Sequence, residues 1–286
     1  MPNRGLEVMD DHRYAILDVS NLAYARWHTI PPIFWEKDPG TLFGALHQTC
    51  AKLQDDLAVD TLIFCFDGGY EFRKKLDPQY KLPRKEAQKS ESDEKQALRQ
   101  ILYDQIRAFR ENHLPIIGCR NIFYAQGLEA DDLIASCVHN LPKARKVYIV
   151  SSDEDLYQLI EGNRVVLYKP IAKTVVNEDD FRQQHTEMPP CLYASAKAWA
   201  GCSSDNITGL KGIGIKKAAK FVMGKGEEKF RKQFTDNVEM YNRNIQLTKL
   251  PAPGTPECVP VHQDLPLKWE ILAEAFKSAS RPRGLK

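Results

Sequence analysis

Short runs of consecutive apolar residues punctuate the first half of the chain, and stretches with helical periodicity separate them. Residues 14–19, 61–66 and 147–150 are rich in β-branched, aromatic and leucine side chains, with no polar alternation, which predicts strands buried on both faces. Between the first two runs, residues 41–57 carry apolar side chains at helical spacing. Buried strand, helix and buried strand in succession are typical of a parallel sheet covered on both faces, so an α/β fold is predicted.

The second half of the chain changes from strands to helices. Residues 165–168 and 174–176 predict a β-hairpin at the edge of the sheet, and nothing after residue 178 has the pattern of a strand. A pair of prolines separates two helical segments and marks a domain boundary. The prediction is an α/β domain over residues 13–188 and a helical domain over residues 189–280.

Other segments are less regular. Residues 1–12 and 30–40 are predicted as irregular, the second because it is rich in proline. Residues 91–111 predict a long helix that is only partly packed, since its apolar positions are scattered among polar ones. Residues 116–117 and 121–124 predict one or two further short strands.

Composition and charge limit the class of protein. The chain has 286 residues, of which 43% are hydrophobic and 27% charged, which is typical of a globular protein with a real core. No apolar run is long enough to cross a membrane, and the first residues lack the apolar segment of a signal peptide. The seven cysteines include no Cys-x-x-Cys pair, so a reducing cytoplasm is expected. A monomer is expected by default, and the net charge of +2 leaves nucleic-acid binding to local patches.

Carboxylates gather where the predicted strands end and where one helix begins. They are Asp18, Asp67, Glu129, Asp131, Asp132, Asp153 and Asp155. Open α/β sheets place their active sites at the carboxyl ends of the strands. One or two of these acids at a helix start could instead be caps or partners of the helix dipole. The number of acids favours a site for Mg²⁺, which prefers carboxylate oxygens; Mn²⁺ is expected to substitute.

A basic segment follows the second predicted strand. Lysines and arginines outnumber acids over residues 70–90, and Tyr70, Phe72 and Tyr80 lie among them. Basic residues that alternate with aromatic ones suit a surface that contacts phosphates and stacks bases. A solvated, charged helix face is the alternative for each basic side chain taken alone.

A glycine-rich turn in the second half is also basic. Gly209, Gly212 and Gly214 permit tight turns and a close approach of the backbone to a ligand. Lys216 and Lys217 then begin a helix, whose free amide groups and positive dipole end suit a phosphate. This turn is predicted to contact a nucleic-acid backbone without reading its sequence.

These motifs, in this order, resemble the 5′-nuclease superfamily, which includes bacteriophage flap endonucleases and the 5′-exonuclease domain of bacterial DNA polymerase I. Asp18 is similar to the family's first-strand aspartate, and Asp67 to its Phe-Asp-Gly motif. Residues 129–132 resemble its Glu-Ala-Asp-Asp motif and residues 152–155 its Asp-x-Asp motif. Residues 80–84 resemble its Tyr-Lys-x-x-Arg motif, and residues 209–219 its helix–three-turn–helix element.

The resemblance implies a PIN-like parallel-sheet nuclease domain with a helical arch over about residues 70–112. A small helical domain that contains the helix–three-turn–helix would follow. That element would hold duplex DNA, with K⁺ as a further possible ligand. Lys81 and Arg84 would reach the scissile phosphate, and Tyr80 would stack on a base.

Two metal sites are implied by the same resemblance. The first would comprise Asp18, Asp67, Glu129, Asp131 and Asp132. The second would comprise Asp153, Asp155 and Asp205, and here the chain departs from the family pattern. The family has a carboxylate where this sequence has Cys202. A thiol is a poor ligand for Mg²⁺, so a weaker second site is expected unless Cys202 faces away from it.

The function implied is two-metal hydrolysis of phosphodiester bonds at the 5′ ends of flaps, nicks and duplex ends in DNA replication or repair, with RNA–DNA hybrids and RNA primers as further substrates. Two alternatives stay open. One is a DNA-junction-binding protein of the same fold with weak or no catalysis, which Cys202 favours. The other is an RNA-cleaving PIN-like domain, which the glycines of the helix–three-turn–helix disfavour.

Overall fold

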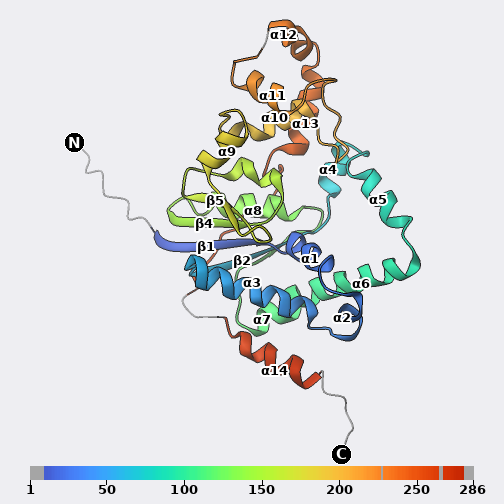
Figure 1. The fold of residues 1–286 in the computed structure, drawn as a ribbon, viewed down its shortest axis with the longest axis vertical. Coiled ribbons are helices and arrows are strands. Elements are labelled where there is room, and N and C mark those ends of the chain that lie inside the picture. The colour runs from blue at the N-terminus through green and yellow to red at the C-terminus, as the bar shows by residue number, and fades with distance from the viewer. Residues whose placement is uncertain (1–9, 227, 264–266, 280–286) are drawn as a thin grey trace, which may run out of the picture.

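A six-stranded sheet forms the centre of the protein (Figure 1). The computed structural model describes residues 10–226, 228–263 and 267–279. The strands are β1 (Asp10–Asp18), β2 (Thr61–Phe66), β3 (Ile122–Tyr124), β4 (Ala144–Val150), β5 (Val165–Lys169) and β6 (Thr174–Val176). Their order is β3-β2-β1-β4-β5-β6, so the first strand of the chain lies in the middle of the sheet.

The pairing confirms the prediction of a mostly parallel sheet. Strands β1 to β5 pair in parallel, and β6 pairs antiparallel with β5 as the predicted edge hairpin. Every residue of β2 is buried, because helices cover both faces of the sheet at this strand. The carboxyl ends of β1, β2 and β4 lie at one edge, and Asp18 ends β1 there.

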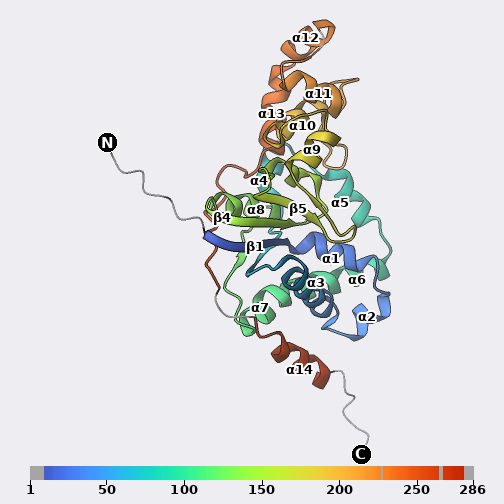
Figure 2. The same ribbon diagram turned by 60° about the vertical axis from the view of Figure 1, so that its left-hand side comes forward.

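Two hydrophobic clusters fill the two sides of the sheet. Helices α1 (Val19–Trp27), α3 (Thr41–Leu57) and α6 (Asp93–Ala108) contribute to one side. Helix α8 (Ala130–His139) contributes to the other side, together with parts of the later helices (Figure 2). This is the covered sheet that the unbroken apolar runs predict.

Three local predictions were wrong. Strand β1 begins at Asp10 rather than at residue 14, because its first residues pair with Ala144 at the start of β4. The proline-rich segment contains helix α2 (Pro32–Lys37), since proline is tolerated in a first helical turn and Trp35 is buried. Residues 116–117 form no strand: α7 (Leu114–Ile116) is helical there, and Ile117 ends that turn.

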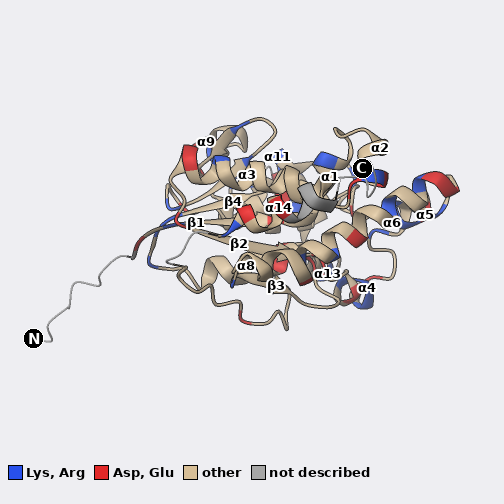
Figure 3. Cartoon of the chain, turned by 90° about the horizontal axis from the view of Figure 1, so that it is seen from below, with Lys and Arg blue, Asp and Glu red and all other residues tan. Residues whose placement is uncertain are grey.

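The segment after β2 forms an arch at one side of the sheet. It contains α4 (Glu71–Leu76), α5 (Leu82–Lys89) and α6, followed by a π-helical turn at Phe109–His113. The long helix predicted over residues 91–111 is thereby confirmed. Figure 3 shows basic and acidic positions along α5 and α6, where they extend away from the sheet.

Within the described residues, every element after β6 is helical. These elements are α9 (Glu178–Gln184), a 3₁₀ turn (Pro190–Leu192), α10 (Tyr193–Ala200), α11 (Ile215–Val222), α12 (Glu228–Thr235), α13 (Val238–Thr248) and α14 (Trp269–Ala279). One hydrophobic cluster contains both Ile149 of β4 and Trp199 of α10, so this part packs against the sheet domain. The predicted domain boundary near residue 189 stays a prediction. No helix in the described ranges is long and apolar enough to cross a membrane.

The turn between α10 and α11 depends on glycine. Gly201 has a φ of +79°, which disfavours other residues, and its missing Cβ would lie 2.5 Å from the amide nitrogen of Gly209. Asn244 of α13 is fully buried and donates hydrogen bonds of 2.8 Å to the carbonyl oxygens of Ala198 and Thr208. These contacts fix the turn against α10 and α13.

Candidate metal and nucleic-acid site

A cavity of about 490 Å³ lies at the carboxyl ends of β1, β2 and β4, beside the arch. Five carboxylates line it, and we call them the carboxylate cluster: Asp18, Asp67, Glu129, Asp131 and Asp153. Five basic residues of the arch line it as well: Lys81, Arg84, Lys85, Arg107 and Arg110. The cavity thus combines groups that attract cations with groups that attract phosphate.

Asp18 is held rigidly at the end of β1. Its carboxylate caps α1 by accepting a hydrogen bond of 3.0 Å from the amide of Asn21. It accepts another of 2.9 Å from the hydroxyl of Ser151, which follows β4. Burial, followed by the charge of Asp67, raises the pKa of Asp18 to about 7. The protein therefore holds a carboxylate here whose charge lacks a compensating cation.

Asp67 follows β2 and joins the cluster through the start of α8. Its carboxylate accepts a hydrogen bond of 2.8 Å from the amide of Ala130. Gly68 next to it is required, because a Cβ there would lie 1.9 Å from the carbonyl oxygen of Ala125. The close approach of these two backbone segments brings Asp67 to the helix start that carries Glu129 and Asp131.

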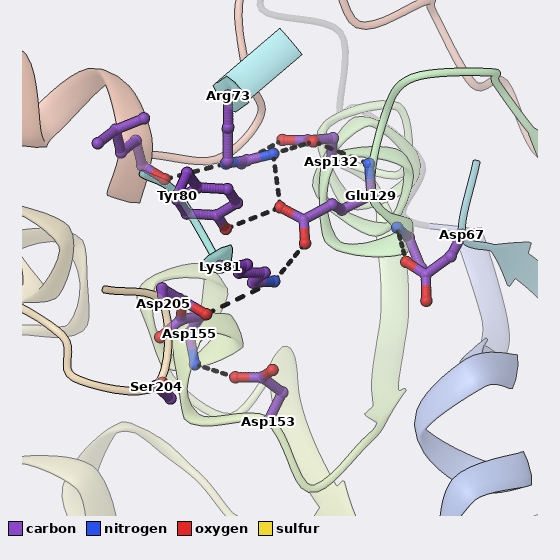
Figure 4. A network of polar contacts seen from close by, with 12 residues as sticks. Asp67, Arg73, Tyr80, Lys81, Glu129, Asp132, Asp153, Asp155, Ser204 and Asp205 are labelled. Atoms are coloured by element: carbon purple, nitrogen blue, oxygen red, sulfur yellow. Dashed lines mark hydrogen bonds and ion pairs between the residues drawn. The ribbon is translucent and has the colours of Figure 1, made fainter. Parts of the chain in front are cut away.

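Glu129 is bound by three donors (Figure 4). The hydroxyl of Tyr80 donates a hydrogen bond of 2.9 Å, and the guanidinium of Arg73 lies 3.1 Å away. The ammonium of Lys81 also forms an ion pair with Glu129. Burial lowers the pKa of Lys81, but Glu129 and the other acidic groups around it together outweigh burial and raise that pKa. The arch is thus bound directly to the carboxylate cluster.

Asp131 and Asp153 complete the cluster. Burial raises the pKa of Asp131 well above its usual value, and the negative charges of Asp153 and Asp18 add to this effect. Burial and the charge of Asp155 raise the pKa of Asp153 in the same way. Carboxylates that destabilise one another's charged form are the electrostatic signature of a cation site.

Asp132 corrects the predicted first metal site. Its side chain is fully buried and forms a bidentate ion pair with Arg73, at 2.6 and 2.8 Å. It also accepts a hydrogen bond of 2.8 Å from the amide of Ala252. Its oxygens face away from the cavity, so Asp132 stabilises the structure and is not placed to bind a cation.

Tyr80 corrects the predicted stacking role. The residue is 4% exposed and packs with Ile207 and Leu247 in a small hydrophobic cluster. Its hydroxyl is engaged with Glu129, and burial raises its pKa. No face of Tyr80 is available to a base, so its contribution is to position Glu129.

The predicted second metal site is occupied by positive side chains. Lys197 of α10, which the sequence did not single out, forms an ion pair with Asp155. Asp205 lies 3.6 Å from the ammonium of Lys81. The sulfur of Cys202 lies 3.6 Å from the Oδ2 atom of Asp205, so this thiol faces the predicted site.

The residues fit one divalent cation better than two. Mg²⁺ takes carboxylate oxygens and keeps several waters, which suits the carboxylate cluster. In the described part of the chain no three acidic, cysteine or histidine side chains converge as closely as around a bound ion. Asp18, Asp67, Glu129, Asp131 and Asp153 would therefore hold a cation that keeps part of its water shell, and that cation would supply Lewis acidity. On the side of Asp155 and Asp205 the thiol and two ammonium groups fit a second cation poorly.

The arch adds a basic wall that sequence reasoning only partly identified. Tyr103, Arg107 and Arg110 line the cavity from α6 and the turn after it, at positions i, i+4 and i+7 of a helical face. Arg110 stacks on Tyr124 of β3, with 3.7 Å between its guanidinium carbon and the ring centre. The helical spacing of Tyr103, Arg107 and Arg110 is a signal that could have found them.

The predicted backbone-binding turn lies before α11. Lys216 and Lys217 are both exposed, whereas the next residues of the helix are buried. The ammonium of Lys217 donates a hydrogen bond of 3.0 Å to the carbonyl oxygen of Gly212. Helix α11 begins at Ile215, one residue before the predicted start at Lys216, and Gly214 is its N-terminal cap. The exposed amide end of this helix and its lysines leave the turn suited to phosphate.

A parallel sheet with a carboxylate cluster at its carboxyl edge defines a class of α/β proteins that bind divalent cations. Residues 13–186 match the family described as the 5′-3′ exonuclease, N-terminal resolvase-like domain. The chain therefore belongs to this family.

Individual relatives agree with the family assignment. A 5′-3′ exonuclease of Mycoplasmopsis pulmonis is 29% identical over 80% of this chain and 74% of its own. A 5′-3′ exonuclease of Mycoplasma pneumoniae is 35% identical over 71% of this chain and 68% of its own. A DNA polymerase I of Rhizobium leguminosarum is 27% identical over 96% of this chain, which spans only 27% of that longer protein.

Solved structures confirm the fold. The T5 5′-exonuclease with bound zinc ions has a TM-score of 0.72 and 20% identity, and the match covers 94% of this chain and all of that one. A bacteriophage T5 flap endonuclease in a complex with DNA and metal ions has a TM-score of 0.71 and 22% identity, covering 94% and 99% of the two chains. The architecture is thus shared although the sequences differ at most positions.

Proposed function

We propose that the protein is a metal-dependent 5′-3′ exonuclease and flap endonuclease, which hydrolyses phosphodiester bonds at the 5′ ends of branched or nicked DNA. The observation that carries this proposal is the single cavity shared by the carboxylate cluster and the basic side of the arch. The family, the relatives named 5′-3′ exonucleases and the T5 flap endonuclease bound to DNA support it.

Different groups of residues have different roles in the reaction. A divalent cation, Mg²⁺ or Mn²⁺, supplies Lewis acidity and an activated water when it is bound to the carboxylate cluster. Lys81 and Arg84 place positive charges at the cavity wall, where they stabilise the negative charge that develops on the phosphate. Arg107 and Arg110 extend this charge along the arch and hold the strand next to the cleaved bond.

The rest of the substrate is assigned to the turn before α11. Lys216, Lys217 and the amides at the start of that helix hold the duplex backbone, with K⁺ as a further ligand of the turn. RNA–DNA hybrids with a 5′ RNA segment are included as substrates, since backbone contacts do not read bases. The protein is proposed to work as a monomer in the cytoplasm, in DNA replication or repair. A two-cation mechanism would place the second ion near Asp153, Asp155 and Asp205.

Digestion of a 5′-labelled flap substrate tests the proposal. With Mg²⁺ we expect products cut at or near the flap junction, single nucleotides from a nicked duplex, and no cleavage when EDTA replaces the cation. A matched blunt duplex with a blocked 5′ end serves as the control. If the flap substrate is bound, as a shifted band on a native gel, but gives no cleavage product at any Mg²⁺ concentration, the result would contradict nuclease activity. It would favour the alternative of a junction-binding protein.

A further inference from the structure

Lys197 is a largely enclosed cation on the side of the site where a second divalent ion is expected. It reaches from α10, and its side chain is only 12% exposed. Its ammonium forms an ion pair with Asp155, whose side chain is 20% exposed. The ammonium therefore stays charged where it lies.

Cys202 stands near Asp155 and Asp205 where the family has a carboxylate, so this side of the site has one negative charge fewer than the family pattern. Its sulfur lies 3.0 Å from the hydroxyl of Ser204 and 3.6 Å from the carboxylate of Asp205, within the protein's own turn. A neutral thiol contributes neither charge nor a hard oxygen to a Mg²⁺ ion. Cys202 and Lys197 line one continuous cavity with Asp153 and Asp155, so both changes act on one volume.

The two sides of the site differ in how many of their carboxylates form ion pairs. We call the side with Asp155 and Asp205 the far side, and the side with Asp18, Asp67, Glu129 and Asp131 the near side. On the far side, Asp155 pairs with Lys197, and Asp205 lies 3.6 Å from Lys81. On the near side, Glu129 pairs with Arg73 and with Lys81, whose ammonium lies closer to Glu129 than to Asp205. Within the described ranges, no lysine or arginine forms an ion pair with Asp18, Asp67 or Asp131. A divalent cation is attracted to the near side, where Asp18, Asp67 and Asp131 form no ion pair, and is repelled from the far side by the ammonium of Lys197.

We propose that the ammonium of Lys197 takes the place of a second divalent cation, so that this protein binds a single divalent cation, at its carboxylate cluster. The inference rests on the metal dependence in the proposed function, and it changes the number of ions from two to one. Lys197 and Cys202 act together in it. The first supplies a permanent positive charge, and the second lowers the negative charge that would otherwise hold a divalent ion.

Counting bound Mn²⁺ by electron paramagnetic resonance tests the inference without a cleavage assay. For the wild-type chain we expect one Mn²⁺ per molecule, with no second ion at ten times the concentration that fills the first. The double variant Lys197→Met with Cys202→Asp is expected to bind two ions, its second ion at least tenfold more tightly than in the wild type. Lys197→Arg keeps the charge and is expected to retain a count of one.

Lys169→Met is the matched control. Lys169 lies 3.9 Å from Glu154 at the edge of the same region and lines neither cavity, so the count should stay at one. Far-ultraviolet circular dichroism and thermal unfolding show which variants are folded. Two ions of similar affinity in the wild type would overturn the inference, as would a single ion in a folded double variant. Either result leaves the flap digestion to decide the proposed function separately, since cleavage with Mg²⁺ is compatible with one ion or two.

Discussion

The guanidinium of Arg73 forms a bidentate ion pair with the carboxylate of Asp132 in the interior of the protein, with nitrogen–oxygen distances of 2.6 and 2.8 Å. Arg73 lies on α4 at the base of the arch, and Asp132 lies in the first turn of α8. The same guanidinium donates a hydrogen bond of 3.0 Å to the carbonyl oxygen of Leu247 at the end of α13. One side chain thereby ties the arch, the sheet domain and the later helices together.

Replacing Arg73 by methionine is expected to destabilise the protein strongly. Asp132 would be left in the interior without its cationic partner, which costs about 3–5 kcal/mol. Urea unfolding followed by circular dichroism measures the change in the free energy of unfolding. Arg145→Met is the control, because Arg145 forms only an exposed ion pair with Asp11 and is expected to cost about 1 kcal/mol or less. Equal losses in the two variants would show that the Arg73 pair is not structural.

Two neighbouring aspartates are expected to give opposite results. Asp131→Asn should reduce cleavage roughly a hundredfold or more, because a cation ligand is lost, while flap binding persists. Without metal, Asp131→Asn should also unfold at a higher temperature than the wild type, since Asp153 and Asp18 repel the charge that the substitution removes. Asp132→Asn should lower the unfolding temperature, because Arg73 loses its carboxylate partner. Cleavage rates and thermal unfolding in EDTA check both. Wild-type cleavage by folded Asp131→Asn would contradict the site.

Stability without divalent cations is expected to fall as the pH rises. Asp18 has its pKa raised to about 7 in the folded protein from 3.8, so the folded state binds more protons than the unfolded state between these values. Its contribution to stability is fully present below pH 3.8 and is lost as the pH rises through about 7. Thermal unfolding in EDTA at pH 5 and pH 8 measures this, and Asp18→Asn should flatten the dependence. An unchanged dependence in that variant would show that Asp18 is not the titrating group.

The turn before α11 is expected to control binding to every DNA sequence alike. Lys216→Ala with Lys217→Ala should weaken duplex binding, and the slope of log affinity against log salt should shrink by roughly one to two units. Fluorescence anisotropy at several salt concentrations measures the slope. Lys52→Ala with Lys268→Ala is the control. Both lysines are exposed; Lys52 lies in α3 and Lys268 directly precedes α14, and both helices are remote from α11 in Figure 1. A loss of slope in the control alone would place the duplex elsewhere.

Local patterns in the sequence predicted most of the sheet. Unbroken apolar runs such as residues 61–66 identify strands buried on both faces, and a sheet edge collects the acids that follow them. The start of β1 and the helix at Trp35 were missed because pairing with β4 and burial against the core decide them. These long-range contacts leave no local signature in the chain.

The sequence predicted which residue types form the site, but not the direction in which each side chain points. Asp131 and Asp132 are adjacent, yet successive residues of a helix point about 100° apart, so one faces the cavity and the other faces Arg73. Their order in the sequence does not tell which is which. Tyr80 was expected at a base because it stands among lysines, but Leu247, far along the chain, covers it. Lys197 carries no motif, and only the fold brings it to Asp155.

The central place of β1 sets when this protein becomes active during its own synthesis. Strand β1 leaves the ribosome first, yet it pairs with β4, which is translated more than a hundred residues later. Asp18 has no contact with Ser151, and the carboxylate cluster lacks Asp153, until β4 and the residues after it have been synthesised. At about 5–20 residues per second, the 135 residues from Asp18 to Asp153 take roughly 7–27 seconds to translate, and the carboxylate cluster is incomplete during that time. Until β4 has been synthesised and has paired with β1, the nascent chain therefore lacks the complete carboxylate cluster that cleavage of nucleic acid requires.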